Sequence, residues 1–446
     1  MKKFIITGLL LSSFVVFSQE HFSGFTTSTR VGLLNAGINP SELVNLKSRF
    51  EVQLFSVSIN TNNNKVGFKD IVNGTNIEKK LFASNDPVNA NFDAELQGPG
   101  FAMKALGWGF AIQAKSFVKG NVVDVDAKLG DALSNSGINS VFGSAALNVD
   151  KNQRLNATAW GEIGLSAAHK IFENDKHKIS GGVTIKLLFP ATYANIGVDK
   201  FQGTINNVAG NLSLTNASAG VNFAYSGTLA NSFNNASDYG KSLFGGLNGF
   251  ATDLGVNYVL KSTLSNYKLK IGASVRNIGS MTFKGDNNQS TNYQLKIQGA
   301  QSLNLNQFDG AESPKEIENK LLASGFLTKT EQKNDIVVKL PTVFNLYADL
   351  QIIPKLNITA FLQQKINSNS GNDQINAQNS FSLTPRFNIK FFEVFAPIGF
   401  QEFAGTTVGF GFRIGGFFLG SNSIITALTS DSKQADAYMG FRFGFL

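Results

Sequence analysis

The chain has 446 residues, a formal net charge of +8, 40 phenylalanines, 44 glycines and no cysteine. The lack of cysteine excludes disulfides and thiolate metal sites. Lysine and arginine are dispersed with no basic run, so we expect no nucleic-acid partner. After residue 18, no apolar run reaches the ~20 residues of a membrane-spanning helix, which excludes a helical membrane protein.

Residues 1–18 have the pattern of a secretory signal peptide. The basic start Met1-Lys2-Lys3 is followed by a nearly continuous apolar run over residues 4–17. Such a run is too short to span a membrane and is typical of an export signal that is later removed. We therefore predict an exported protein that is cleaved after Ser18.

From residue 49 onward, many segments alternate between apolar and polar residues with the period of two of a β-strand. In residues 267–275 the cations Lys268 and Lys270 oppose the apolar side, and Arg276 continues their side. A Lys or Arg that faces lipid at mid-membrane costs ~2–4 kcal/mol, so these side chains should face the lumen of a membrane barrel. Applied to the other strands, this alternation predicts the following lumen-facing charges: Lys268, Lys270, Arg276, Arg386, Lys390, Arg413 and Arg442.

Two roles are open for these inward cations. They could attract an anionic solute, or they could pair with acidic residues such as Glu51, Glu162, Asp253 and Asp349 across a plugged lumen. Buried charges must be paired or hydrated, and for that reason we favour the second role.

The connections between the expected strands alternate in length. Short polar turns occur at 173–176, at 262–266 and around Pro354, whereas long Asn-, Ser- and Gly-rich stretches occupy residues 60–98, 191–249, 280–335 and 367–379. Outer-membrane barrels have short periplasmic turns and long external loops, and counting on this basis gives about 14 strands. We predict an all-β protein: a transmembrane antiparallel β-barrel over residues 47–446, preceded by an N-terminal segment at residues 19–46.

One long connection should contain a helix. Ser313 is a suitable N-cap, Pro314 stands at the first helical position, and Glu316 completes a capping box. Gly325 is a natural stop. The helix could be a lid on the external mouth or a docking element for a partner, and we favour the lid.

The last residues predict the strand that closes the barrel. Met439, Phe441, Phe443 and Phe445 point to one side, and small or charged residues point to the other. Bulky apolar residues on one side suit a strand between lipid and a polar interior, although the last strand of a soluble sandwich would alternate in the same way.

Around Asn39, Pro40 and Ser41 the chain resembles outer-membrane barrels of the long-chain fatty-acid transporter type (FadL-like) and the related barrel subunits of type IX secretion. The entry Leu340-Pro341 to a strand and the glycine-rich stretch 405–420 are also similar to this group. More closely, the chain resembles a family of uncharacterised outer-membrane barrels. The resemblance implies that the N-terminal segment folds into the barrel as a plug. Ser41 stands where the group more often has alanine.

Nothing in the sequence predicts a catalytic, cofactor or metal site. His169 and His177 flank the turn at 173–176 and could approach each other, but turn histidines are far commoner than metal ligands. No serine stands in a Gly-x-Ser-x-Gly elbow, and a Ser-His-Asp lipase would be recognised only by its geometry. We therefore expect a protein that is not an enzyme and has no cofactor.

Together these features predict a protein of the cell outer membrane, in contact with outer-membrane lipid and inserted by the barrel-assembly machinery. Two functions follow from the resemblance: passage of a small hydrophobic solute, or service as a membrane subunit of a larger complex. In the second case the partners are other outer-membrane proteins or secretion-machine subunits, and the barrel is a scaffold that transports nothing. An outer-membrane lipid hydrolase is the third alternative.

Overall fold

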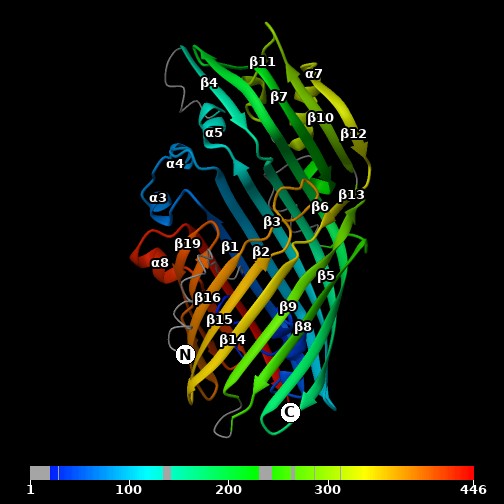
Figure 1. Ribbon diagram of the computed structural model, residues 1–446, viewed down its shortest axis with the longest axis vertical. Coiled ribbons are helices and arrows are strands. Elements are labelled where there is room, and N and C mark those ends of the chain that lie inside the picture. Colours follow the sequence, from blue (N-terminus) through cyan, green and yellow to red (C-terminus); the bar gives the residue numbers. More distant parts are fainter. Residues whose placement is uncertain are drawn as a thin grey trace, which may run out of the picture.

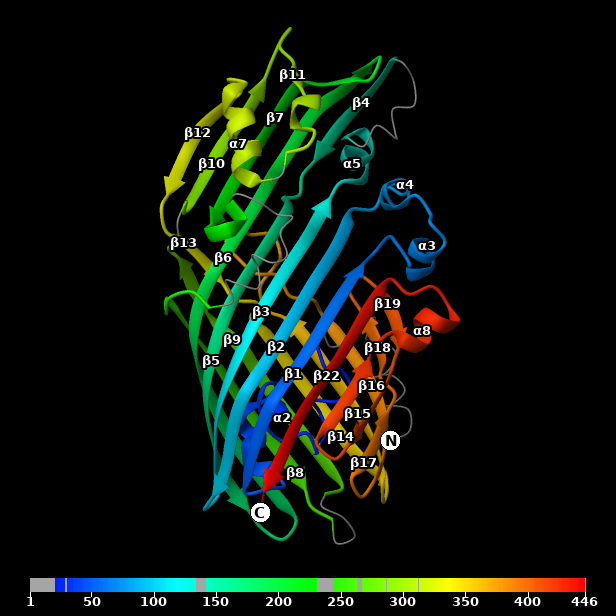
Figure 2. The same ribbon diagram turned by 180° about the vertical axis from the view of Figure 1, so that it is seen from behind.

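The computed structural model describes residues 21–445 except 29, 134–141, 231–243, 263–266, 286 and 312, so the expected signal peptide lies outside the described residues. The chain forms a closed antiparallel β-barrel of 14 strands that continues at one end into a second sheet (Figures 1 and 2). The predicted fold class and strand number are confirmed. We call the end with the second sheet the upper end and the opposite end the lower end.

Three of the fourteen positions are each divided into two strands: β17 with β18, β19 with β20, and β14 with the short β13 (Ile336–Lys339), which both pair with β9. In order around the barrel, the strands are β1 (Phe50–Asn63), β2 (Val88–Ala105), β3 (Trp108–Val125), β5 (Gln153–Glu173), β6 (His177–Val208), β8 (Gly249–Leu260), β9 (Leu269–Phe283), β14 (Val343–Ile353), β15 (Leu356–Lys365), β16 (Ser380–Ile389), β17 (Phe392–Phe395) with β18 (Ile398–Gln401), β19 (Gly405–Val408) with β20 (Phe410–Ile414), β21 (Phe417–Ser421) and β22 (Gln434–Phe445).

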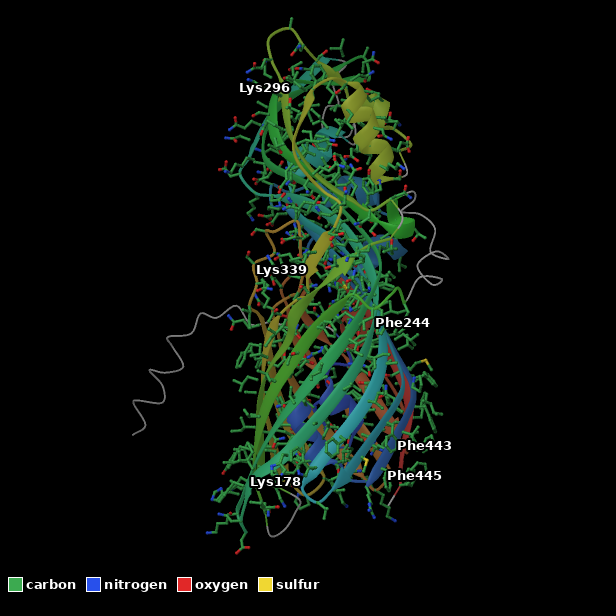
Figure 3. All side chains as sticks on the ribbon, turned by 90° about the vertical axis from the view of Figure 1, so that its right-hand side faces the viewer. Lys178, Phe244, Lys296, Lys339, Phe443 and Phe445 are labelled. Carbon is green, nitrogen blue, oxygen red and sulfur yellow. The ribbon has the colours of Figure 1, made fainter. Side chains whose placement is uncertain are left out.

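The alternation of the sequence becomes an apolar exterior and a polar interior. On β8, Leu254 and Val256 are 50% and 55% exposed, whereas Asp253 and Asn257 are buried. Side chains around the lower half of the barrel are mostly carbon, and nitrogen and oxygen gather in the upper sheet and at the lower tip (Figure 3). Because a closed barrel pairs every strand, an apolar belt of this kind can face lipid without unsatisfied backbone groups.

The barrel closes between its first and last strands. β22 pairs with β1 in antiparallel register, with Phe445 opposite Phe50. Met439 and Phe445 are exposed, whereas Gly440 and Arg442 are buried on the inner side. Among the described residues, no helix is long and apolar enough to cross a membrane.

At the upper end, several strands continue beyond the barrel as an extension sheet with the order β4, β6, β7, β10 and β12 (Figures 1 and 2). β6 alone spans 32 residues and belongs to both parts. Much of the stretches 191–249 and 280–335, expected to be loops, is therefore strand. The further elements here are β4 (Phe142–Val149), β7 (Asn211–Ser226), β10 (Gln289–Ile297), β11 (Leu303–Asn304), β12 (Leu327–Lys333), β13 (Ile336–Lys339), α5 (Ala127–Leu133), α7 (Pro314–Ala323), η2 (Gly227–Ala230) and η3 (Asn306–Phe308).

Helix α7 covers one face of the extension sheet. Ser313 caps it by accepting a hydrogen bond from the Glu316 backbone N–H, and Gly325 follows its end with a φ of +76°. This confirms the predicted helix. Ile317 and Leu321 pack on a core of strand side chains that includes Phe223. Three short helices, α3 (Phe68–Val72), α4 (Ile77–Leu81) and α8 (Ile424–Thr429), lie at the outer rim of the barrel (Figure 2).

A buried carboxylate fixes α7 to the sheet and gives a test of this arrangement. Glu318 accepts hydrogen bonds from the hydroxyls of Tyr225, at 2.7 Å, and Tyr293, at 2.5 Å. Glu318→Ala leaves both buried hydroxyls without their acceptor and is expected to cost roughly 3 kcal/mol of docking energy. Limited proteolysis should then cut residues 298–326 faster. Asn319→Ala, an exposed neighbour on the same helix, should leave the cleavage rate unchanged.

Candidate functional site

The described residues of the range 21–46, all but residue 29, lie inside the barrel, and we call them the N-terminal segment (Figure 2). They include α2 (Leu33–Ala36) and the 3-10 helix η1 (Pro40–Asn45). Asn39 caps η1, since its side chain accepts from the Ser41 backbone N–H, and Pro40 stands at the first helical position. The Asn39 amide also donates to the backbone oxygen of Val256 at 2.9 Å. The Asn-Pro-Ser motif therefore makes a short helix and attaches it to the wall.

A row of small residues on five neighbouring strands forms the seat of η1. Consecutive members of this small-residue row are direct cross-strand neighbours: Gly109, Ala168, Gly182, Gly255 and Ser274. A Cβ atom added at Gly255 would lie 2.0 Å from the Asn39 side-chain oxygen, and one at Gly182 would lie 2.5 Å from the Ser41 backbone nitrogen. The wall is thus hollowed where the segment lies against it.

Charged side chains of the wall hold the same segment. Lys270 Nζ lies 3.2 Å from Glu42 Oε2, and the Tyr347 hydroxyl donates to Glu42 Oε1. Arg386 donates to the backbone oxygen of Gly24 at 2.8 Å. Since Lys270, Glu42 and Arg386 are almost fully buried, each needs its partner to offset the loss of water.

The connection between β15 and β16, residues 366–379, crosses to the opposite wall, and we call it the cap loop. Arg154 on β5 donates from Nη2 to the Asn376 side-chain oxygen at 2.7 Å. The Tyr193 hydroxyl on β6 donates to the backbone oxygen of Asn372 at 2.8 Å. The cap loop therefore lies across the lumen at a second level, above the N-terminal segment.

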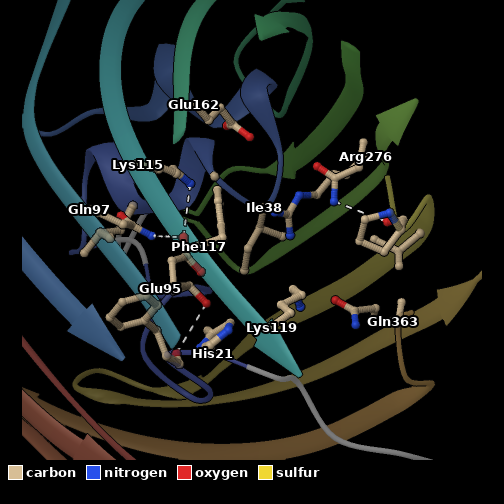
Figure 4. Close-up of a pocket in the computed structure, with 18 of the residues that line it drawn as sticks. His21, Ile38, Glu95, Gln97, Lys115, Phe117, Lys119, Glu162, Arg276 and Gln363 are labelled. Atoms are coloured by element: carbon tan, nitrogen blue, oxygen red, sulfur yellow. Dashed lines mark hydrogen bonds and ion pairs between the residues drawn. The ribbon is translucent and has the colours of Figure 1, made fainter. Parts of the chain in front are cut away.

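Three cavities follow one another from the upper to the lower end. A pocket of about 950 Å³ lies above the cap loop and is lined by residues 368–372 and the upper ends of several strands. A chamber of about 80 Å³ lies between the N-terminal segment and Ala377 of the cap loop (Figure 4). A third pocket, of about 440 Å³, lies below the segment and includes Arg30 and Lys47.

The chamber wall carries charges from several elements (Figure 4). His21 Nε2 lies 3.0 Å from Asp93 Oδ1, and Asp93 also pairs with Lys119. Lys115 Nζ lies 3.5 Å from Glu95 Oε1. Six ionisable side chains line so small a space: His21, Glu95, Lys115, Lys119, Glu162 and Arg276. The chamber therefore suits a polar occupant rather than an apolar one.

Arg276 enters the chamber from the wall opposite Lys115 (Figure 4). Its Nε atom is buried and has no hydrogen-bond partner in the described part of the chain. No described carboxylate lies within ion-pair distance of this guanidinium group. Arg276 can therefore still donate hydrogen bonds to a molecule in the chamber.

The residue types of a Ser-His-Asp hydrolase do meet at this place. Ser58 Oγ lies 2.8 Å from His21 Nδ1, and Asp93 is on the other side of the ring. However, Ser58 is only 2% exposed, and Asp93 is already paired with Lys119. The arrangement therefore ties the start of the N-terminal segment to β1 and β2, and it gives a substrate no approach to the hydroxyl.

Most of the predicted lumenal cations lie on the inner side of the wall: Lys270, Arg276, Arg386, Arg413 and Arg442. The prediction is wrong for Lys268 and Lys390, which are exposed. Lys268 precedes the first residue of β9, and Lys390 lies in the turn after β16 with a φ of 47°. The alternation of inward and outward side chains holds only within a strand. It therefore does not determine where these two side chains point.

Several residues of the closed lumen were not predicted. The small-residue row, the cap loop and its anchor Arg154 have no motif of their own. One member of the small-residue row can be recognised in the sequence. Gly255 stands at an inward position of a clearly alternating strand. A glycine there weakens the strand, so it indicates that another part of the chain approaches closely.

The fold defines the class of protein: a 14-strand membrane barrel that resembles the long-chain fatty-acid transporter type. The chain belongs to a family of unknown function, DUF5723, whose model matches residues 40–422. No curated protein matches the sequence.

Solved structures with a similar fold include hydrocarbon channels. A TodX monoaromatic hydrocarbon channel mutant has 10% identity, with 97% of this chain and 100% of that chain covered and a TM-score of 0.50. The toluene transporter TbuX of Ralstonia pickettii has 12% identity, coverage of 93% and 94%, and a TM-score of 0.42. The toluene transporter TodX of Pseudomonas putida has 10% identity, coverage of 91% and 92%, and a TM-score of 0.42. At such identity the likeness is one of fold.

Proposed function

We propose that the protein is a gated channel of the outer membrane that passes a small polar solute. The observation that carries the proposal is the succession of three cavities separated by the cap loop and the N-terminal segment. A barrel that served only as a scaffold would need no cavity between the cap loop and the N-terminal segment. Because outer-membrane barrels have short periplasmic turns and long external loops, we assign the lower end to the periplasm and the extension sheet to the outside of the cell.

The charges of the chamber bear on the class of solute. A hydrophobic solute, as the resemblance implies, would need an apolar chamber, whereas His21, Lys119 and Arg276 all reach this one. Moving a hydrocarbon past ionised groups gives it no favourable contact and desolvates the groups. We therefore infer a polar solute, which enters when the cap loop and then the N-terminal segment move.

Solute flux into proteoliposomes tests the proposal. Arg154→Ala removes the anchor of the cap loop and should increase the entry of small polar solutes several-fold over the wild type. Ser370→Ala is the matched control, because among the described residues its exposed hydroxyl bonds only to Ser368 in the same loop. Equal, negligible flux in all three proteins would contradict a channel.

A second function, as the membrane subunit of an assembly such as a secretion machine, is favoured by the extension sheet. Within the described part of the chain, its outer strand β12 pairs only with β10, and residues 328–333 are exposed. An unpaired edge is a surface on which another chain can dock. Native mass spectrometry after mild-detergent purification should find a stoichiometric partner for a subunit and none for a lone channel.

A further inference from the structure

The third cavity is a pocket at the lower end of the barrel, between the underside of the N-terminal segment and the ends of β1, β20 and β22. We call it the basic pocket. It has a volume of about 440 Å³ and is open to solvent at Lys47 and Lys390, which are exposed. Its cationic lining residues are Arg30, Lys47, Lys390, Arg413 and Arg442.

The carboxylates near the basic pocket satisfy only some of these cations. Glu51 pairs with Arg442, and Glu393 lies 3.7 Å from Arg30 Nε. For the three other cations, Lys47, Lys390 and Arg413, the described chain offers no carboxylate within ion-pair distance. The pocket therefore keeps an excess of positive charge.

Two of the guanidinium groups are buried with free hydrogen-bonding capacity. Arg413 and Arg442 are 6% and 9% exposed. The buried Nε atom of each has no hydrogen-bond partner among the residues that the structure describes. A buried N–H group without an acceptor costs about 1–3 kcal/mol, more when it is charged, so both sites favour an incoming acceptor.

Lys47 responds to the same surroundings. Partial burial, and then the positive charge of Arg30, lowers the pKa of Lys47 to about 8, with Arg413 and Arg442 adding to the repulsion and Glu393 opposing it. An anion among these groups would relieve the repulsion.

We propose that the basic pocket binds a small multivalent oxyanion of the phosphate type. Several cations approach the pocket from different sides, which suits a tetrahedral anion with acceptors in several directions, and guanidinium groups match phosphate oxygens geometrically. The pocket is larger than one phosphate ion, so a diphosphate or a phosphate monoester fits better. This site does not depend on solute passage, since it lies outside the lower closure of the lumen.

Titration calorimetry on the purified full-length protein in detergent tests the site, with inorganic pyrophosphate as the probe. We expect saturable binding that weakens at least ~tenfold in Arg413→Gln and in Lys390→Gln. Lys268→Gln is the matched control, because Lys268 is an exposed cation near the same end but outside the pocket. Unchanged heat-modifiable gel mobility shows that each variant is folded. No saturable binding, or equal binding in all four proteins, would overturn the proposal.

The source of the phosphate is distinguished in nanodiscs. If lipid headgroups occupy the pocket, nanodiscs of phosphatidylglycerol should abolish pyrophosphate binding, whereas nanodiscs of phosphatidylcholine should not. If the ligand is a free anion, both should leave binding intact. Either outcome supports a phosphate site, and loss of binding in both kinds of nanodisc would contradict it.

The pH dependence of binding gives an independent readout. The charged groups around Lys47 are Arg30, Lys390, Arg413, Arg442, Glu51 and Glu393, and its pKa is about 8 in the free protein. A bound anion stabilises the protonated amine and raises this pKa, so the Lys47 contribution to the affinity should be full below pH 8 and be lost as the pH rises above it. Pyrophosphate itself titrates in this range and affects both proteins alike, so the readout is the ratio of wild-type to Lys47→Gln affinity. This ratio should exceed one below pH 8 and fall above it, and a ratio that does not change with pH would exclude Lys47 from the site.

Discussion

Replacing both Gly182 and Gly255 with alanine is expected to displace the N-terminal segment from its seat and open the lumen. The added Cβ atoms would lie 2.5 Å from the Ser41 backbone nitrogen and 2.0 Å from the Asn39 side-chain oxygen, distances that require the segment to move. Overpacking of this kind costs roughly 1–3 kcal/mol, and 1.4 kcal/mol is a factor of ten in an equilibrium. Single-channel recordings in planar bilayers should therefore show at least ~tenfold more open time than the wild type.

The control for this prediction is another glycine of the inner wall. A Cβ atom added at Gly164 on β5 would lie 3.5 Å from the Thr184 side chain, which is ordinary contact. Gly164→Ala should therefore keep the wild-type conductance. If the double variant is folded and remains closed, the N-terminal segment is not seated by the small-residue row, or its displacement does not open a path.

The barrel itself could be predicted because every strand must present apolar side chains to lipid on one side and can present polar ones to the lumen on the other. The lipid side of β8 must be apolar at Leu254 and Val256, and the lumen side tolerates Asp253 and Asn257. The same rule placed Lys270 inside. It failed at Lys268, because this residue lies beyond the strand, where lipid no longer selects the direction of a side chain.

The extension sheet escaped prediction because it stands outside this constraint. The outer face of this sheet meets water and not lipid. The outward positions of its strands, such as Ser218 and Gly220 on β7, can therefore be small or polar. Asn216, with a φ of 47°, also shifts the alternation, so that Leu214 and Ala217 are both buried although they are three residues apart. When apolar and polar residues differ little along a strand and their alternation is interrupted, the sequence looks like that of a polar loop.

The N-terminal segment and the cap loop are held by contacts between residues far apart in sequence. Arg154 meets Asn376, and Glu42 meets Lys270, more than 200 residues away. From a single sequence one can predict which side chains of a strand face the lumen, but not which residues they contact across it. The sequence could therefore predict that inward charges need partners, but it could not identify those partners.

Removing one partner of the buried pair Glu42 and Lys270 is expected to cause the largest loss of stability. Glu42→Ala leaves the Lys270 ammonium, 1% exposed, without a carboxylate and removes the acceptor of the Tyr347 hydroxyl. Breaking a buried ion pair in this way costs about 3–5 kcal/mol. Urea unfolding followed by tryptophan fluorescence can measure it, because Trp160 lines the chamber beside the N-terminal segment.

The double variant Glu42→Gln with Lys270→Met separates the cost of a lone charge from the value of the pair. Gln keeps an oxygen acceptor for Tyr347, and Met fills much of the lysine volume without a charge to desolvate, so most of the lost stability should return. Glu331→Ala, at an exposed pair with Lys333, should leave the unfolding midpoint unchanged. If Glu42→Ala were as mild as Glu331→Ala, water would have to reach Lys270, and the lumen could not be closed at the level of η1.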